Sequence, residues 1–197
     1  MPEAIHEVAH EATHDAAHSK SGHAKLIGLL ISVLALFLAG AELLGNSAQT
    51  AGLATNIEAS NTWNFFQAKT VRQIAVRTAL ENARISGNTN SPEQQRQLAA
   101  WQANIERWES EPSTSEGRKE LMARAKRLEA ERDAKLAQYH AYEIVSLILQ
   151  LGIVLASVSL LSSLPAFAVA SIILGGGALT LLSAIYFDWH IITRFLH

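Results

Sequence analysis

The sequence predicts an all-α integral membrane protein with three transmembrane helices, and with an extramembrane helical hairpin or coiled-coil stalk between the first helix and the second. Hydrophobic residues make up 49% of the 197 residues and charged residues only 17%. From Ile144 to Phe187 the chain contains no Asp, Glu, Lys or Arg. This block is about twice as long as the roughly 20 residues that one membrane helix needs. Pro165 divides it near the middle, so we expect two membrane helices joined by a tight turn.

A third apolar block, from Leu26 to Gly45, predicts the first membrane helix, because Glu42 is its only charged residue. The alternative is a signal peptide that is cleaved after the pattern Ala39-Gly40-Ala41. The region before the block is long and acidic, which favours an uncleaved anchor. The predicted divisions are a His- and Glu-rich tail at 1–24, transmembrane helices at 25–45, 143–164 and 166–187, an extramembrane helical stalk at 46–142, and a C-terminal tail at 188–197.

The basic residues give two opposing indications of the orientation in the membrane. Lys20 and Lys25 precede the first span and favour a cytoplasmic N-terminus. Six basic residues flank the other spans and favour a cytoplasmic central segment: Arg124, Lys126, Arg127, Arg132, Lys135 and Arg194. Because the second group is larger, we expect a multi-pass protein of a bacterial inner (cytoplasmic) membrane with its stalk on the cytoplasmic side. An aromatic belt is expected at the stalk's side of the membrane, from Tyr139, Tyr142, Tyr186 and Trp189.

The central segment is poor in Gly and rich in strong helix formers, which predicts three helices. The first is expected from about Thr55 to Asn82. The second begins after Ser91, where Gln94 can complete a capping box, and ends before Pro112. The third begins near residues 113–116 and continues to Leu164. Apolar residues form partial seams on the third helix (Leu121, Ala125, Leu128, Leu136 and Tyr139) and on the first (Val76, Leu80 and Ala83). Each seam needs a partner helix, from the same chain or from a second copy.

Aromatic and basic residues mark two candidate interaction surfaces in the central segment. Trp101 and Trp108 are seven residues apart on one helix face, where they either pack on neighbouring helices or dock a partner protein. The other set, which suits a membrane interface, helix packing or a partner-docking surface, is Trp63, Phe65, Phe66, Lys69 and Arg72. The segment has 13 basic and 11 acidic residues, which are interspersed. This distribution is typical of a solvated helical surface and argues against a nucleic-acid groove.

The N-terminal tail repeats four residues that end in histidine, at His6, His10, His14 and His18. The repeat generates the pattern H-E-x-x-H twice, but no surrounding domain supplies the third ligand or the closed cleft of a zinc protease. On a helix, successive histidines of the repeat can chelate zinc, nickel or copper weakly, and no other cofactor is expected. Protonation of these histidines and His23 is a second possibility, and a solvated low-complexity tail is a third.

Two polar side chains are predicted inside the spans, Glu42 and Gln150, both on the side that faces the central segment. An intramembrane carboxyl group suggests a proton or cation site, although Glu42 lies near enough to the end of its helix to reach the interface. His140, Glu143, Asp188 and His190 are expected at the same boundary. Small residues along the second span (Gly152, Ala156, Ser159 and Ser163) and the third (Ser171, Gly175 and Ala178) indicate close helix packing.

Two segments of the chain carry a resemblance to a known family: Leu43-Leu44-Gly45-Asn46 and Ala59-Ser60-Asn61-Thr62-Trp63-Asn64-Phe65-Phe66-Gln67-Ala68-Lys69-Thr70-Val71-Arg72-Gln73. The chain resembles an uncharacterised bacterial membrane family, domain of unknown function 4337, from Ala24 to about Trp189. The His-rich tail departs from that family's pattern. The resemblance implies a helical integral membrane protein and supplies no activity, substrate or catalytic residues.

The function that we expect is that of a non-enzymatic membrane scaffold or accessory subunit, which presents a helical stalk for protein–protein assembly. Its expected partners are membrane lipid and either further copies of itself or another membrane protein. The alternative is a metal- or proton-responsive membrane protein that uses the His-rich tail. An enzyme is the least favoured class, because the sequence contains no recognisable catalytic constellation.

Overall fold

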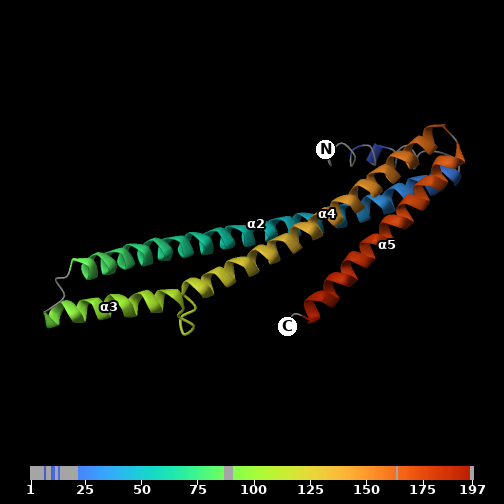
Figure 1. Cartoon of the computed structure of the whole chain (residues 1–197). Coiled ribbons are helices and arrows are strands. Elements are labelled where there is room, and N and C mark those ends of the chain that lie inside the picture. The colour runs from blue at the N-terminus through green and yellow to red at the C-terminus, as the bar shows by residue number, and fades with distance from the viewer. Residues whose placement is uncertain are drawn as a thin grey trace. The chain divides into compact units, whose positions relative to one another are not determined.

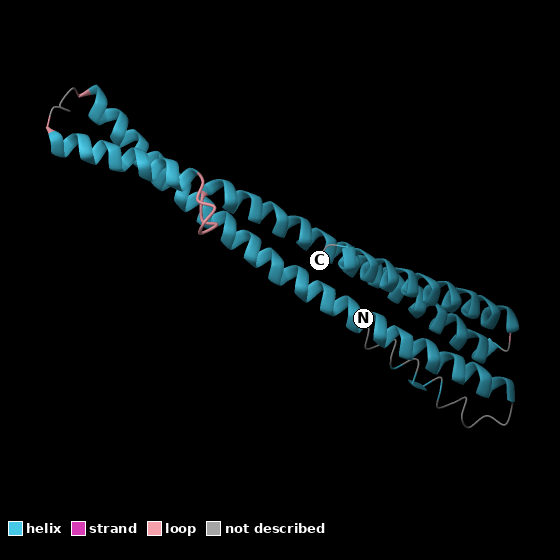
Figure 2. Ribbon diagram, turned by 90° about the horizontal axis from the view of Figure 1, so that it is seen from below, coloured by secondary structure: helices cyan, strands magenta, loops and turns pink. Residues whose placement is uncertain are grey.

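The computed structural model describes Glu7, His10, Glu11, Thr13 and residues 22–86, 91–162 and 164–195, with side chains up to residue 187. Four long helices account for most of these residues: α2 (Gly22–Ile85), α3 (Pro92–Glu109), α4 (Arg118–Ser162) and α5 (Pro165–Phe195) (Figure 1). The described part of the chain contains no strand, and its connection between α3 and α4 is an irregular loop (Figure 2). The fold is therefore all-α, as predicted.

The chain divides into two compact units, which are described separately here. Unit 1 comprises the described residues of 1–50 and 135–197, and unit 2 comprises those of 51–134. Both α2 and α4 contribute to both units.

Within the described part of the chain, three helices are long and apolar enough to cross a membrane, the number of such helices that the sequence predicts. Only 22–39% of the residues in their most apolar stretches are buried within the structure, so most of that apolar surface is not covered by the rest of the described chain. The turn between the last two spans lies where it was predicted, because α4 ends at Ser162 and Pro165 begins α5. Proline suits the first position of a helix, where no backbone hydrogen bond is lost.

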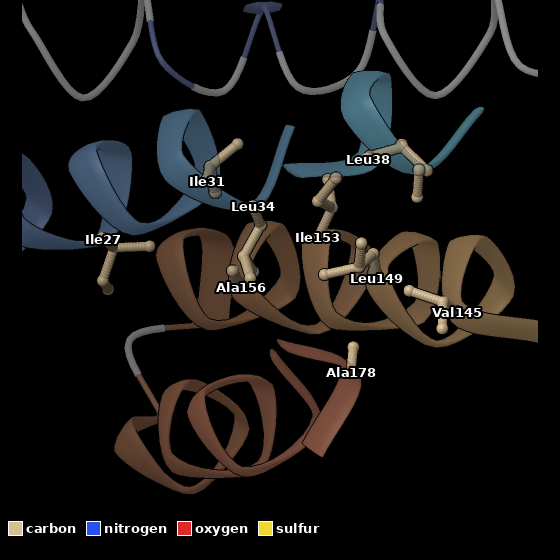
Figure 3. Packing of buried hydrophobic residues seen from close by; sticks show 10 residues of the cluster. Ile27, Ile31, Leu34, Leu38, Val145, Leu149, Ile153, Ala156 and Ala178 are labelled. Atoms are coloured by element: carbon tan, nitrogen blue, oxygen red, sulfur yellow. The ribbon is translucent and has the colours of Figure 1, made fainter. Parts of the chain in front are cut away.

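The core of unit 1 consists of aliphatic side chains at helical spacing. Figure 3 shows how these side chains of α2 and α4 lie between their helices, together with one residue of α5. The labelled core residues are Ile27, Ile31, Leu34 and Leu38 of α2, Val145, Leu149, Ile153 and Ala156 of α4, and Ala178 of α5. Recurrence every three or four residues places each set on one face of its helix, which explains why the helices pack along their length.

Small residues allow α5 to approach the other two helices of unit 1. The Ser171 hydroxyl donates a hydrogen bond of 2.7 Å to the backbone carbonyl of Gly152, which requires close contact between α4 and α5. A Cβ atom at Gly175 would lie 2.6 Å from Cδ2 of Leu34, whereas Gly176 has nothing within 4 Å of its Cβ position. The predicted small-residue packing surface is thus confirmed at these positions, and Ser163 lies outside the described residues.

In unit 2, α2 and α4 run antiparallel. Contacts with residues further along α2 involve residues earlier in α4: Asn56 with Arg132 at 3.1 Å, Glu58 with Arg124 at 2.6 Å, and Thr70 with Arg118 at 3.0 Å. Apolar residues close the interior of the unit, where Leu80, Ile105, Leu121, Ala125 and Leu128 are buried. Half of the predicted seam residues are therefore buried core, the other half are partly buried, and the partner helix belongs to the same chain.

Two helix boundaries differ from the sequence prediction and one agrees with it. A separate helix beginning near Thr55 was wrong, because α2 continues unbroken from Gly22 to Ile85. A Cβ at Gly45 would lie 3.4 Å from the Tyr142 Cβ, so close packing on α4 offsets the poor helix propensity of glycine. The third helix begins at Arg118, after the expected 113–116. The predicted capping box is confirmed, because the Ser91 hydroxyl accepts from the Gln94 amide and the Gln94 side chain accepts from the Ser91 amide.

Candidate functional site

A polar network in unit 2, here named the clasp, joins α2, α3 and α4 through Thr70, Gln73, Glu109 and Arg118. Arg118 Nη1 donates to Gln73 Oε1 and to Glu109 Oε2, both at 2.7 Å, and Arg118 Nε donates to Thr70 Oγ1 at 3.0 Å. Gln73 is 2% exposed, and its Nε2 donates to the Ile105 carbonyl at 3.0 Å and to Glu109 Oε2 at 3.1 Å. Each polar group is thus paired across a helix boundary, which makes burial of the network favourable.

The basic side chain of Lys69, which belongs to the set expected to suit a membrane interface, helix packing or a partner-docking surface, lies inside unit 2. It is 7% exposed, and its ammonium group donates to the Glu116 backbone carbonyl and lies 3.6 Å from the Glu116 carboxylate. Phe65 receives this ammonium 5.2 Å from its ring centroid, and Phe66 receives the Arg118 guanidinium at 5.3 Å. These contacts pair cations with aromatic faces within the chain.

The tryptophans also contact residues of their own unit. Trp63 Nε1 donates to Glu129 Oε1 at 2.9 Å, and the Trp63 ring meets Phe66 edge to face. The Arg72 guanidinium lies 5.7 Å from the centroid of Trp108. Trp101 and Trp108 are both half-buried on α3. The structure therefore brings together most of the predicted interaction residues as packing contacts among α2, α3 and α4.

The loop between α3 and α4 is held by one acidic side chain. Glu120 accepts from the Ser110 hydroxyl at 2.6 Å and from the Glu111 amide at 3.1 Å. The same loop contains Ser115 in a left-handed backbone conformation, with φ of 57°. Lys69 of α2 therefore contacts, at Glu116, a loop whose first residues are held by Glu120 of α4.

Two carboxylates of this region have lowered pKa values. Hydrogen bonding from Gln73 is the largest cause for Glu109, and the Arg118 charge adds to it against the opposing effect of burial. Hydrogen bonding from Ser110 is the largest cause for Glu120. Both groups are ionised in the folded state at a pH where they are already partly protonated in the unfolded chain.

Stability in acid is expected to depend on these two carboxylates. A lowered pKa contributes stability that is fully present above the ordinary value of 4.5 and is lost as the pH falls through the folded-state value. Replacement of both by glutamine is expected to flatten the decline of the unfolding midpoint below pH 4.5, while lowering stability at pH 7. Thermal unfolding followed by circular dichroism between pH 3 and pH 7 measures this. A parallel acid decline in the wild type and the double variant would contradict it.

A cavity in unit 1, here named the Glu42 cavity, brings together the two polar residues predicted inside the spans. Gln150 Nε2 donates to Glu42 Oε1 at 3.5 Å, a long contact between α4 and α2. The cavity has a volume of about 280 Å³, and its other polar lining residues on these helices are Asn46, Glu143 and Ser146. Tyr139 and Tyr142 complete the polar end of the wall. His140 lies 3.3 Å from Glu143, whereas the side chains of Asp188 and His190 lie outside the described residues.

The His-rich tail contributes little to the described structure. His10 is exposed, and His6, His14 and His18 lie outside the described residues. Among the described residues, no group of three or more His, Cys, Asp or Glu side chains is arranged to hold a metal ion.

Sequence reasoning identified Glu42 and Gln150 but missed Ser146, Gln73 and Arg118. Ser146 has no signal of its own, since serine is common in membrane helices. Gln73 and Lys69 belong to the segment that carries the family resemblance, and four-residue spacing places them on one helix face. That spacing could have indicated that Gln73 and Lys69 face the interior of unit 2 together.

Comparison with known proteins identifies a family for this chain. A family model described as a domain of unknown function, DUF4337, matches residues 23–187. Comparison with curated proteins and with solved structures found no match. The matched range includes all three membrane-spanning candidates, the clasp and the Glu42 cavity. The chain therefore belongs to the DUF4337 family, a domain family of unknown function.

Proposed function

We propose that the protein is a non-enzymatic integral membrane scaffold or accessory subunit, whose unit 2 forms an extramembrane helical stalk that associates with a second copy of the chain. In this proposal the three spans lie in an inner membrane and the stalk lies on the cytoplasmic side. The observation that carries the proposal is an apolar stripe on α2 within unit 2. The stripe consists of Leu53, Ile57, Val71, Ile74 and Ile85, each between 56% and 84% exposed.

The stripe lies on the face of α2 opposite the clasp. At about 100° per residue, its members fall near one helix direction, and the buried residues Thr62, Lys69 and Gln73 fall near the opposite one. α3 and α4 of the same chain pack on the buried face, so they leave the stripe uncovered. A row of exposed aliphatic side chains on an otherwise polar unit indicates a protein–protein contact.

The spacing of the stripe favours a second copy as the occupant. Positions 53, 57, 60, 64, 67, 71, 74 and 78 alternate steps of four and three, which is the pattern of a coiled-coil seam. Ser60, Asn64 and Gln67 occupy the middle of this seam. Polar residues at seam positions weaken an interface but fix its register, which suits association between identical helices.

The oligomeric state of the intact protein tests the proposal. Purified full-length protein in mild detergent is measured by light scattering coupled to size exclusion, with Val71→Glu and Ile74→Glu combined. The wild type is expected to be a dimer or higher oligomer, and the double variant is expected to shift to monomer, because two carboxylates would be buried in the seam. Ala123→Glu with Ala130→Glu on α4 adds the same charge at exposed positions off the stripe and serves as the matched control. A monomeric wild type, or a double variant as oligomeric as the control, would refute the proposed self-association.

A further inference from the structure

The Glu42 cavity has the chemistry of a cation site. Glu42 and Glu143 supply two carboxylates from facing helices, and the residues that line the cavity include no Lys, Arg or His. Gln150 uses its amide nitrogen on Glu42, so its carbonyl oxygen is oriented as an acceptor. A cation that enters this cavity would meet oxygen acceptors from both helices without an opposing positive charge on the wall.

Ser146 provides an independent indication of a ligand. The side chain lines the cavity, is 7% exposed, and makes no hydrogen bond within the described part of the chain. In that part of the chain, no fully enclosed side-chain oxygen or nitrogen lacks a partner, so this hydroxyl opens into the cavity. A serine in a helix commonly donates to the carbonyl four residues earlier, as Ser157 does to Ile153 at 2.9 Å. Ser146 does not make this hydrogen bond, and its side chain lines the cavity that Glu42 and Glu143 also line.

The aromatic residues of the wall favour an organic ammonium group over a metal ion. Tyr139 and Tyr142 line the cavity beside the carboxylates, and aromatic faces attract ammonium groups. The described residues contain no cluster of three or more His, Cys, Asp or Glu that suits a metal ion. Sites that hold alkylammonium groups combine carboxylates with neutral oxygen atoms and aromatic rings, and the wall of this cavity has the same composition.

We propose that the Glu42 cavity, through Glu42, Glu143, Ser146 and the two tyrosines, binds an alkylammonium group. Such a group is carried by the headgroups of ethanolamine and choline lipids and by free amines. The cavity lies where the apolar stretches of α2 and α4 give way to charged residues, at the depth of a lipid headgroup if these helices span a membrane. The site belongs to unit 1 and the apolar stripe to unit 2, so the two proposals fail independently.

The wild-type protein alone gives the first test, which no folding defect can obscure. Binding of choline and of its uncharged carbon isostere 3,3-dimethyl-1-butanol is measured by ligand-observed NMR on the full chain in detergent. The measurement is made at pH 8. Choline is expected to bind at least tenfold more tightly than the isostere. Equal binding of the two, or no choline binding at millimolar concentration, would overturn the proposal.

Matched variants localise the site. Glu42→Gln combined with Glu143→Gln is expected to weaken choline binding at least tenfold, and Ser146→Ala is expected to weaken it by a smaller factor. Glu81→Gln removes one carboxylate at an exposed position outside the cavity and should leave binding unchanged. Helix content of each variant is checked by circular dichroism. Unchanged choline binding by the folded double variant would refute the assignment to this cavity.

The source of the ammonium group is distinguished with lipid. Native mass spectrometry of the full chain compares retention of phosphatidylethanolamine with that of phosphatidylglycerol, which lacks the ammonium group. Preferential retention of the ethanolamine lipid by the wild type, lost in the double variant, assigns the site to a lipid headgroup. Choline binding without lipid preference assigns it to a free amine.

Discussion

Replacing Gly117 by alanine is expected to lower the free energy of unfolding by about 3 kcal/mol, at the upper end of the usual cost of overpacking. A Cβ at this position would lie 2.7 Å from Cα of Ser110 and would overlap the Glu111 nitrogen and the Glu120 carboxylate. Two of these atoms belong to the backbone, so no side-chain rotation relieves the overlap. The loop would have to move, and Glu120 would lose its hydrogen bonds to Ser110 and Glu111.

Urea unfolding of the full chain, followed by circular dichroism, measures this effect. Ser115→Gly in the same loop is the control, because it adds no atoms and relieves the left-handed conformation of Ser115. Relief of roughly 1 kcal/mol for a non-glycine residue in this region is offset by the roughly 0.5–1 kcal/mol that glycine's flexibility costs. Ser115→Gly is therefore expected to be nearly neutral. Equal stability of Gly117→Ala and the wild type would show that the loop is free to rearrange.

Replacing Gly175 by leucine is expected to destabilise the packing of unit 1 by about 3 kcal/mol, because α5 approaches α2 too closely there for a larger side chain. Even a Cβ would lie 2.6 Å from Leu34 Cδ2, and Leu34 itself is buried in the core. Leucine is as compatible with lipid as the neighbouring residues, so the loss reflects packing rather than a change in membrane insertion.

Gly176→Leu provides a control one residue away. This variant adds the same leucine side chain to the same helix, but nothing lies within 4 Å of the Cβ position at Gly176. We therefore expect little effect on stability. Unfolding in a titration of sodium dodecyl sulfate, followed by circular dichroism, compares the two variants. If both lose stability equally, leucine acts through the conformation of α5 itself and the contact with Leu34 does not limit packing.

The long features of the fold were predictable from sequence, because they depend on many residues at once. The charge-free block from Ile144 to Phe187 predicts two helices long enough to span a membrane, and Pro165 predicts the turn between them, whatever the detailed packing. The cap at Ser91 is a local interaction over four residues, so it too is visible in sequence. Continuity of α2 was not predictable, because the contact that supports Gly45 comes from Tyr142, almost 100 positions away.

The candidate site was predictable only in part, for the same reason. The depth of Glu42 and Gln150 in their spans follows from counting residues, and both occur in one cavity. Whether Ser146 and the two tyrosines line the cavity depends on the rotation of α4 about its axis relative to α2. No local sequence pattern determines that rotation. In unit 2, the sequence shows the charge of Lys69 but does not show that its side chain points into the unit. Its partner Glu116 lies on a loop 47 residues later.

The hydrogen bond between Gln73 and the Ile105 carbonyl limits how the family can vary in length. One residue inserted into α2 or α3 between these two positions rotates the following helix by about 100° and turns one partner away from the other. Seven residues added to each helix correspond to nearly two whole turns, with a drift of only about 20°. Natural length variation between Gln73 and Ile105 should therefore come in matched heptads on both helices, with the clasp unchanged.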